Sequence, residues 1–112
     1  MSTSPLRRAV DTLGGTAAGR YLIGRAICAK APYFATIAPR FTLFGPQRVE
    51  ATVRFRRSVQ NHIGSVHAIV MCNLAELIGG GCVELAVDPS LRWIPVGMTV
   101  RYERIARSDI RG

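Results

Sequence analysis

The sequence predicts a single α+β domain that contains short strands and one long apolar helix. Two observations carry this prediction. The apolar residues change from helical spacing to alternation at Arg40, and a nearly continuous apolar segment runs from about His67 to Leu85. The expected order is therefore helix, helix, strand, strand, helix, strand. With 112 residues, of which 48% are hydrophobic and 20% charged, the chain can form one modest core.

Two helices are expected in an N-terminal helical segment, residues 1–34. Ser4 is suited to an N-cap and Pro5 to the first helical position, and Gly14-Gly15 ends this helix. A second helix is expected from about Thr16 to Ala31, because Pro32 stops the pattern. Its apolar face has helical spacing and contains Leu22, Ile23, Ala26 and Ile27.

Two strands are expected next. The first covers Arg40 to Phe44, Gly45-Pro46 forms a turn, and the second covers Gln47 to Arg57. A polar loop is expected from Ser58 to Val66. One face of the second strand is apolar, formed by Val49, Ala51, Val53 and Phe55. The other face meets water, a partner subunit or a charged ligand, and presents Arg48, Glu50, Thr52, Arg54 and Arg56.

The apolar segment from Val66 to Val87 is about as long as a membrane crossing. Each acidic residue near a bilayer centre would cost about 2.5 to 3.5 kcal/mol, and the segment contains both Glu76 and Glu84. We therefore expect a buried core helix and no membrane span. Gly79-Gly80-Gly81 is unusual in a helix, where each glycine costs about 1 kcal/mol relative to alanine. It either admits close approach of a strand or marks a break.

A last strand is expected from Arg92 to Arg104, after a turn at Asp88-Pro89-Ser90. Apolar residues alternate along it, from Ile94 to Tyr102. Pro95 and Gly97 are unfavourable in a central strand, so an edge strand, a bulge or close contact with a ligand is indicated.

The formal charge of +8 and pI near 10.7 indicate an anionic partner, such as nucleic acid, a phosphorylated cofactor or a membrane surface. Lys30 is the single lysine, and the arginines are spread from Arg7 to Arg111, which disfavours a nucleic-acid site.

No secretory signal is evident, because charged residues interrupt the N-terminal apolar residues, and a cytoplasmic location is expected. The three cysteines form no CxxC pair, so neither disulfides nor a zinc knuckle is indicated: Cys28, Cys72 and Cys82.

The stretch from Asn61 to Glu76 contains the residues best suited to chemistry. The first N–H groups of a helix are positively polarised and have no intrahelical acceptor, so the N–H of Ala68, with that of His67 beside it, could hold an oxyanion. Glu76 lies about two and a half turns further along an apolar helix, and could activate water or act as a nucleophile. Asn61 could orient the water or the carbonyl.

Plainer roles for these residues stay open. Glu76 could be a buried carboxylate satisfied by Asn73 or by an arginine. His67 is better suited to capping the helix and bracing the loop than to proton transfer, and His62 to a loop hydrogen bond. The two histidines straddle a loop without a third ligand, so no metal is expected. Cys72 and Cys82 are expected to be core residues.

These residues resemble the hotdog-fold thioesterases, especially the phenylacetyl-CoA type, in which Asn is followed by His six positions later and by an acid nine positions beyond. Asn61, His67 and Glu76 match that spacing, with Leu74-Ala75 before the acid. An uncharacterised hotdog subfamily is more similar still, with its Asn-His-x-Gly-x-x-His-Ala opening and Asn-Leu-Ala-Glu helix. The chain departs from many thioesterases at Ala68, where they have glycine.

The resemblance covers about residues 35–107 and implies a hotdog domain at 35–112, an antiparallel sheet wrapped around the long helix. The family has two further strands after the last one expected here, so the sheet should be incomplete. The implied substrate is an acyl-CoA, with coenzyme A as part of the substrate and no other cofactor, bound by a homodimer or homotetramer. Its phosphates would be attracted by Arg54, Arg56 and Arg101. The alternative function is non-catalytic binding of acyl-CoA or fatty acyl groups.

Overall fold

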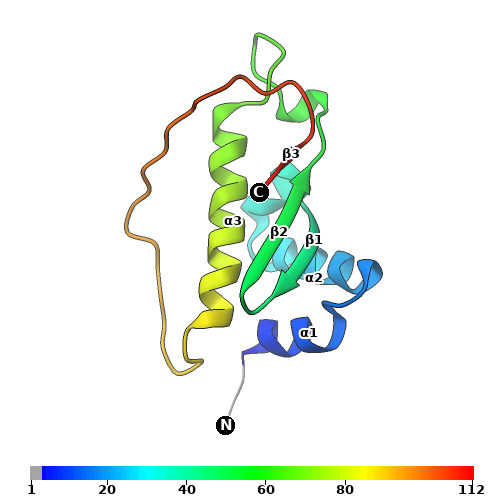
Figure 1. The fold of residues 1–112 in the computed structure, drawn as a ribbon, viewed down its shortest axis with the longest axis vertical. Coiled ribbons are helices and arrows are strands. Elements are labelled where there is room, and N and C mark those ends of the chain that lie inside the picture. The colour runs from blue at the N-terminus through cyan, green and yellow to red at the C-terminus, as the bar shows by residue number, and fades with distance from the viewer. Residues whose placement is uncertain (1–3) are drawn as a thin grey trace.

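A computed structural model describes residues 4–112 as an α+β fold with a small antiparallel sheet and one long helix (Figure 1). Both predicted N-terminal helices are confirmed, as α1 (Pro5–Leu13) and α2 (Ala17–Lys30). The Ser4 side chain accepts a hydrogen bond from the N–H of Arg7 at 3.1 Å, and Thr16 caps α2 in the same way. A 3₁₀ helix, η1 (Pro32–Ile37), leads into the sheet.

The sheet has three antiparallel strands in the order β1-β2-β3. β1 (Arg40–Gly45) and β2 (Arg48–Val53) form the expected hairpin. The prediction that the second strand extends to Arg57 is wrong, because the chain turns into a second 3₁₀ helix, η2 (Arg57–Val59). The predicted apolar face is confirmed at its first three positions, since Val49, Ala51 and Val53 are all buried.

The predicted core helix is present as α3 (Ala68–Ala86), which packs on β2 and η1. Close approach of the sheet explains one of its three glycines. A Cβ on Gly81 would lie 3.2 Å from the Phe44 ring, tighter than an ordinary van der Waals contact. α2 packs near the same face of the sheet, because Gly24 contacts the Phe41 ring. The sheet therefore has one face covered by helices, and Arg48 and Glu50 form an ion pair of 2.9 Å on the other.

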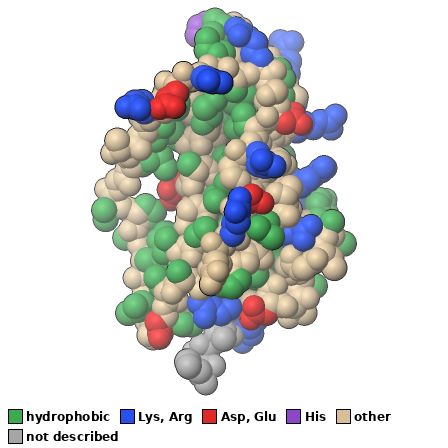
Figure 2. All heavy atoms as spheres, in the orientation of Figure 1, with side chains coloured by type: hydrophobic (Ala, Val, Ile, Leu, Met, Phe, Trp, Pro, Cys, Tyr) green, Lys and Arg blue, Asp and Glu red, His purple; other side chains and the backbone are tan. Residues whose placement is uncertain are grey.

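The predicted strand from Arg92 to Arg104 is not formed. Residues 91–105, here called the strap, run in extended form along α3 (Figure 1). A strand needs a neighbour to pair with, and the free edge of β2 is taken by β3 (Ile110–Arg111), which pairs Val53 with Ile110. Figure 2 shows hydrophobic side chains along the strap, and Val96 is 99% exposed.

Candidate functional site

The loop before α3 is organised by the side chain of Asn61. Its Oδ1 accepts hydrogen bonds from the N–H groups of Ile63 and Ser65, at 3.1 and 3.0 Å, and its Nδ2 donates to Ser65 Oγ at 2.8 Å. Gly64 has a φ of 77°, a conformation that favours glycine. The half-buried amide of Asn61 thus fixes the loop that leads to the start of the helix.

The N-terminus of α3 offers one free backbone donor at the expected place. His67 is the N-cap, and its Nδ1 accepts a hydrogen bond from the N–H of Ile69 at 3.1 Å, so the expected capping role is confirmed. The prediction that the His67 N–H is also an oxyanion donor is wrong, because it donates to the Val59 carbonyl at 2.9 Å. Within residues 4–112, the N–H of Ala68 has no acceptor.

Glu76 lies on α3 with its side chain half-buried at an apolar cavity. The cavity has a volume of about 510 Å³ and is lined by α1, α2, η1, α3 and Trp93 of the strap. Over the part of the chain that the structure describes, the Glu76 carboxylate makes no hydrogen bond and no ion pair. Asn73, a suggested structural partner, instead donates to Thr36 Oγ1 at 3.3 Å.

The structure brings Asn61, His67 and Ala68 together but leaves Glu76 apart from them. Ala68 and Glu76 are eight residues apart on α3, which is about 12 Å of helix rise at about 1.5 Å per residue. His62 is exposed on the loop. One chain therefore presents two half-sites, a donor at the helix start and a carboxylate at the cavity.

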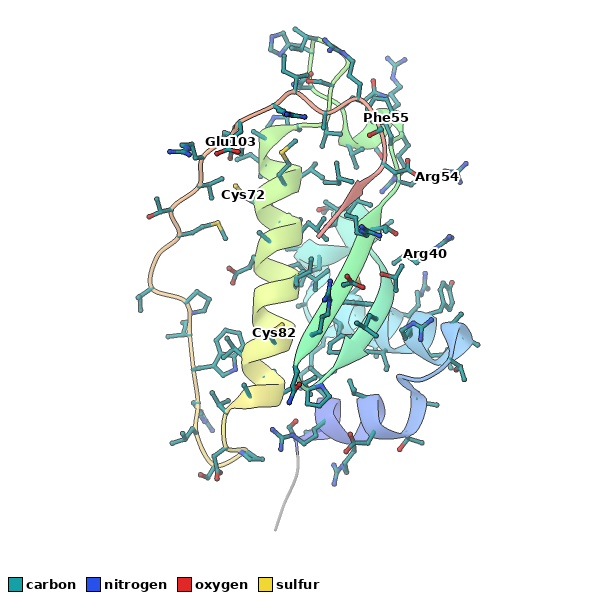
Figure 3. All side chains as sticks on the ribbon, in the orientation of Figure 1. Arg40, Arg54, Phe55, Cys72, Cys82 and Glu103 are labelled. Carbon is teal, nitrogen blue, oxygen red and sulfur yellow. The ribbon has the colours of Figure 1, made fainter. Side chains whose placement is uncertain are left out.

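The three arginines expected at coenzyme A phosphates lie in two places. Arg54 and Arg56 follow β2, and Arg56 hydrogen-bonds to Ser58 Oγ. Arg101 lies on the strap and forms an exposed 2.9 Å ion pair with Glu103. Figure 3 shows Arg54 and Glu103 on opposite sides of α3. On the face drawn in Figure 2, most basic side chains lie on the sheet side and at the upper end.

Sequence reasoning missed two residues that shape these half-sites. Ser65 is 3% exposed, and its Oγ accepts the hydrogen bond from Asn61 Nδ2. A serine in a polar loop does not by itself predict this role. Trp93 donates from Nε1 to Glu84 Oε2 at 2.7 Å and lines the cavity, although the alternation placed it on a strand.

The strap also touches α3 near its start. Tyr102 Oη and Cys72 Sγ are 2.9 Å apart, and this hydrogen bond raises the pKa of Tyr102 above its ordinary value.

On α2, burial raises the pKa of the Cys28 thiol, whereas the charge of Arg25 acts in the opposite direction.

Two further properties, metal binding and membrane insertion, depend on which side chains lie together and on the hydropathy of the helices. Across residues 4–112, no cluster of three or more His, Cys, Asp or Glu side chains is placed to hold a metal ion. In the same residues, α3 is the one helix with the length and hydropathy of a membrane span, and it packs on β2 and η1 here.

Two solved structures are similar to this chain. The crystal structure of genomics APC5556 is 39% identical with a TM-score of 0.81, over 96% of this chain and 72% of that one. The 1.5 Å crystal structure of PA5026 from Pseudomonas aeruginosa, a protein of unknown function described as a "Probable Thioesterase", is 29% identical with a TM-score of 0.70. That likeness covers 80% of this chain and 61% of PA5026.

No curated protein matches the chain significantly. One family does match, and the match runs over residues 19–112, from the start of α2 to the end of β3. This chain therefore belongs to the family described as Domain of unknown function (DUF4442).

Proposed function

We propose that this protein is an acyl-CoA thioesterase-like hydrolase built on a hotdog fold. The observation that carries the proposal is Glu76, a half-buried carboxylate without a partner among the described residues, at an apolar cavity. The α+β architecture agrees with this fold, and the similarity to PA5026, described as a "Probable Thioesterase", supports the reaction class.

The chemistry assigns separate tasks to the two half-sites. Glu76 removes a proton from water as the water oxygen bonds to the thioester carbonyl carbon. The Ala68 N–H holds the oxyanion that forms, assisted by the dipole of α3. When the carbon–sulfur bond breaks, the protonated Glu76 gives that proton to the departing thiolate of coenzyme A, which restores the carboxylate, and the carboxylic acid product leaves. Asn61 is a positioning residue, because its amide shapes the loop before Ala68.

The separation of the half-sites favours a site shared between two copies. Reacting groups must approach to about 3 to 3.5 Å, whereas Ala68 and Glu76 of one chain are about 12 Å apart along α3. Two copies with antiparallel α3 helices could place Ala68 of one beside Glu76 of the other. We therefore propose a homodimer or homotetramer, with the pantetheine arm between subunits.

The basic residues fit the proposed substrate. Arg54 and Arg56 lie just beyond β2, and Arg101 lies on the strap next to Tyr102, which contacts the first turns of α3. Guanidinium groups bind phosphates through paired charge-assisted hydrogen bonds. We propose that these arginines attract the coenzyme A phosphates from either side of the helix start.

Substitution of Glu76 tests the proposed base. Glu76→Gln keeps the size of the side chain but removes its basicity, so kcat/KM for acyl-CoA hydrolysis should fall at least about 100-fold. Release of the free thiol is measured over a panel of acyl-CoAs. The matched control is Glu50→Gln, a carboxylate on the outer sheet face, which should stay within about two-fold of wild type. Equal rates in Glu76→Gln and wild type would contradict the assignment.

One observation favours a second function, non-catalytic binding of acyl-CoA or fatty acyl groups. The cavity is present in a single chain, whereas base and oxyanion donor are not together there. Saturable acyl-CoA binding by wild type without thiol release would select this function over hydrolysis.

A further inference from the structure

The cavity beside Glu76 has the size and character of a small-molecule site. Its volume of about 510 Å³ falls within the range of about 300 to 1,000 Å³ typical of such sites. Its walls are largely aliphatic, and α1 contributes Leu6 and Ala9 while α2 contributes Ile23 and Ile27. Four polar or charged side chains line it, those of Lys30, Glu76, Glu84 and Trp93. An apolar ligand with one polar end fits this lining.

The glycine run of α3 forms the floor of this cavity. Gly80 and Gly81 both line it, whereas Gly79 faces open space, with nothing within 4 Å of the position that a Cβ would take. A Cβ on Gly80 would lie 3.3 Å from Cη2 of Trp93. Gly80 is therefore the glycine whose missing side chain leaves room beside Trp93, whereas a Cβ on Gly81 would meet Phe44 of the sheet instead.

The cavity has two distinct ends along α3. Glu76 lies at one end, and Trp93 and Glu84, which are joined by a hydrogen bond, lie at the other. Eight residues of helix separate Glu76 from Glu84, which is about 12 Å. Carbon–carbon bonds of about 1.5 Å at tetrahedral angles advance about 1.25 Å each, so this length holds about eight to ten carbons.

We propose that this cavity holds the straight aliphatic tail of a medium-chain acyl group, of about eight to ten carbons. The inference rests on the proposed function, because it places the thioester at Glu76 and the tail along Gly80 toward Trp93. α1 is a specificity element, since it forms part of the wall yet precedes the residues that match the family, 19–112.

Two leucine substitutions at neighbouring glycines test the cavity. Leucine favours the helix over glycine equally at both positions, but only residue 80 lines the cavity. Gly80→Leu should lower kcat/KM for decanoyl-CoA at least about ten-fold while leaving butanoyl-CoA within about two-fold, because lost apolar burial affects only long tails. Gly79→Leu should keep the wild-type profile. Ala26→Phe, which fills the cavity from an exposed position on α2, gives the same test if Gly80→Leu does not fold.

Trp93 provides a measurement that does not depend on catalysis. It is the single tryptophan of the chain and lines the cavity beside Glu84. Decanoic acid should shift its fluorescence emission to shorter wavelength in wild type and Gly79→Leu, but not in Gly80→Leu or Ala26→Phe. An emission spectrum of wild type that decanoic acid leaves unchanged would overturn the cavity assignment, even if acyl-CoA is hydrolysed. A saturable shift without any hydrolysis would support the cavity and reject the proposed catalysis.

Discussion

At the scale of single residues, Asn61 illustrates how a side chain can act through its neighbours. Its amide makes three hydrogen bonds within five residues, two as acceptor and one as donor. These bonds fix the backbone that delivers His67 to the N-cap and Ala68 to the first helical position. A substitution at Asn61 should therefore act by lowering the stability of the loop, and should affect catalysis only through the position of the loop.

Replacing Asn61 by alanine and by aspartate separates these effects. Asn61→Ala leaves the N–H groups of Ile63 and Ser65 without their acceptor, so the free energy of unfolding should fall by about 1 to 3 kcal/mol. Asn61→Asp keeps an acceptor of the same shape and should lose less. Urea unfolding measures both variants. An alanine variant as stable as wild type would show that the loop bonds contribute nothing.

The sequence predicted some residue roles and not others for a physical reason. The His67 cap depends on its own helix start, so local sequence was sufficient to predict it. The acceptor of the His67 N–H is the Val59 carbonyl, whose position depends on η2 and on the end of β2. The hydrogen bond from Trp93 to Glu84 likewise depends on the path of the strap, which local periodicity does not determine.

At the scale of elements, both helices before the sheet, the hairpin and α3 follow from local patterns, and the strap does not. The ends of four elements agree with the predicted ends to within one or two residues: α1, α2, β1 and α3. Helix caps, a proline and two changes of apolar period predicted them. The alternation between Ile94 and Tyr102 is equally clear, but alternation specifies only a strand's faces. Pairing requires an edge, and β3 occupies the edge of β2 at Thr52 and Val53.

The turn between α3 and the strap gives a pH-dependent contribution to stability. Asp88 Oδ1 accepts hydrogen bonds from the backbone N–H of Ser90 at 2.8 Å and from its hydroxyl at 2.7 Å. These two bonds, the backbone one having the larger effect, hold the pKa of Asp88 below its ordinary value of 3.8. Because the folded pKa is the lower one, the unfolded chain binds more protons near that pH. The contribution is present above pH 3.8 and is lost as pH falls through the folded pKa.

Asp88→Asn tests this turn. At pH 7 the variant should unfold at a lower urea concentration than wild type, and the two midpoints should converge as the pH falls below 3.8. Ser90→Ala keeps the backbone donor and should show a smaller difference. Unfolding midpoints measured from pH 7 to pH 2 provide the check, and identical midpoints for wild type and Asp88→Asn at pH 7 would contradict it.

At the scale of the whole molecule, the proposed reaction requires a second copy of the chain. Ala68 and Glu76 are separated on one helix, and the strap exposes Ile94 and Val96 with 79% and 99% of their surface open to solvent. Apolar surface of this kind is typical of a region that another chain covers. The proposed assembly and the proposed reaction therefore depend on each other.

Mixing two variants, each with a defect in a different half-site, tests a shared site. In a dimer of Glu76→Gln with Asn61→Ala, one of the two sites combines the intact half of each chain and the other combines both defects. A mixed dimer should therefore recover about half of wild-type turnover, because one of its two sites works. The variants are co-expressed with different tags, and thiol release is measured after purification through both tags. No recovery in purified mixed dimers would place each site within a single chain.

The position of β3 sets an order for folding. The hairpin of β1 and β2 and the helix α3 join residues close in sequence, whereas Val53 meets Ile110 only after the chain between them is complete. Closing so long a loop carries an entropic cost that short-range contacts do not share, and contacts of this kind slow folding. Of the three described strands, β3 is thus the last to pair during synthesis, and until it pairs the edge of β2 is open to any other extended chain.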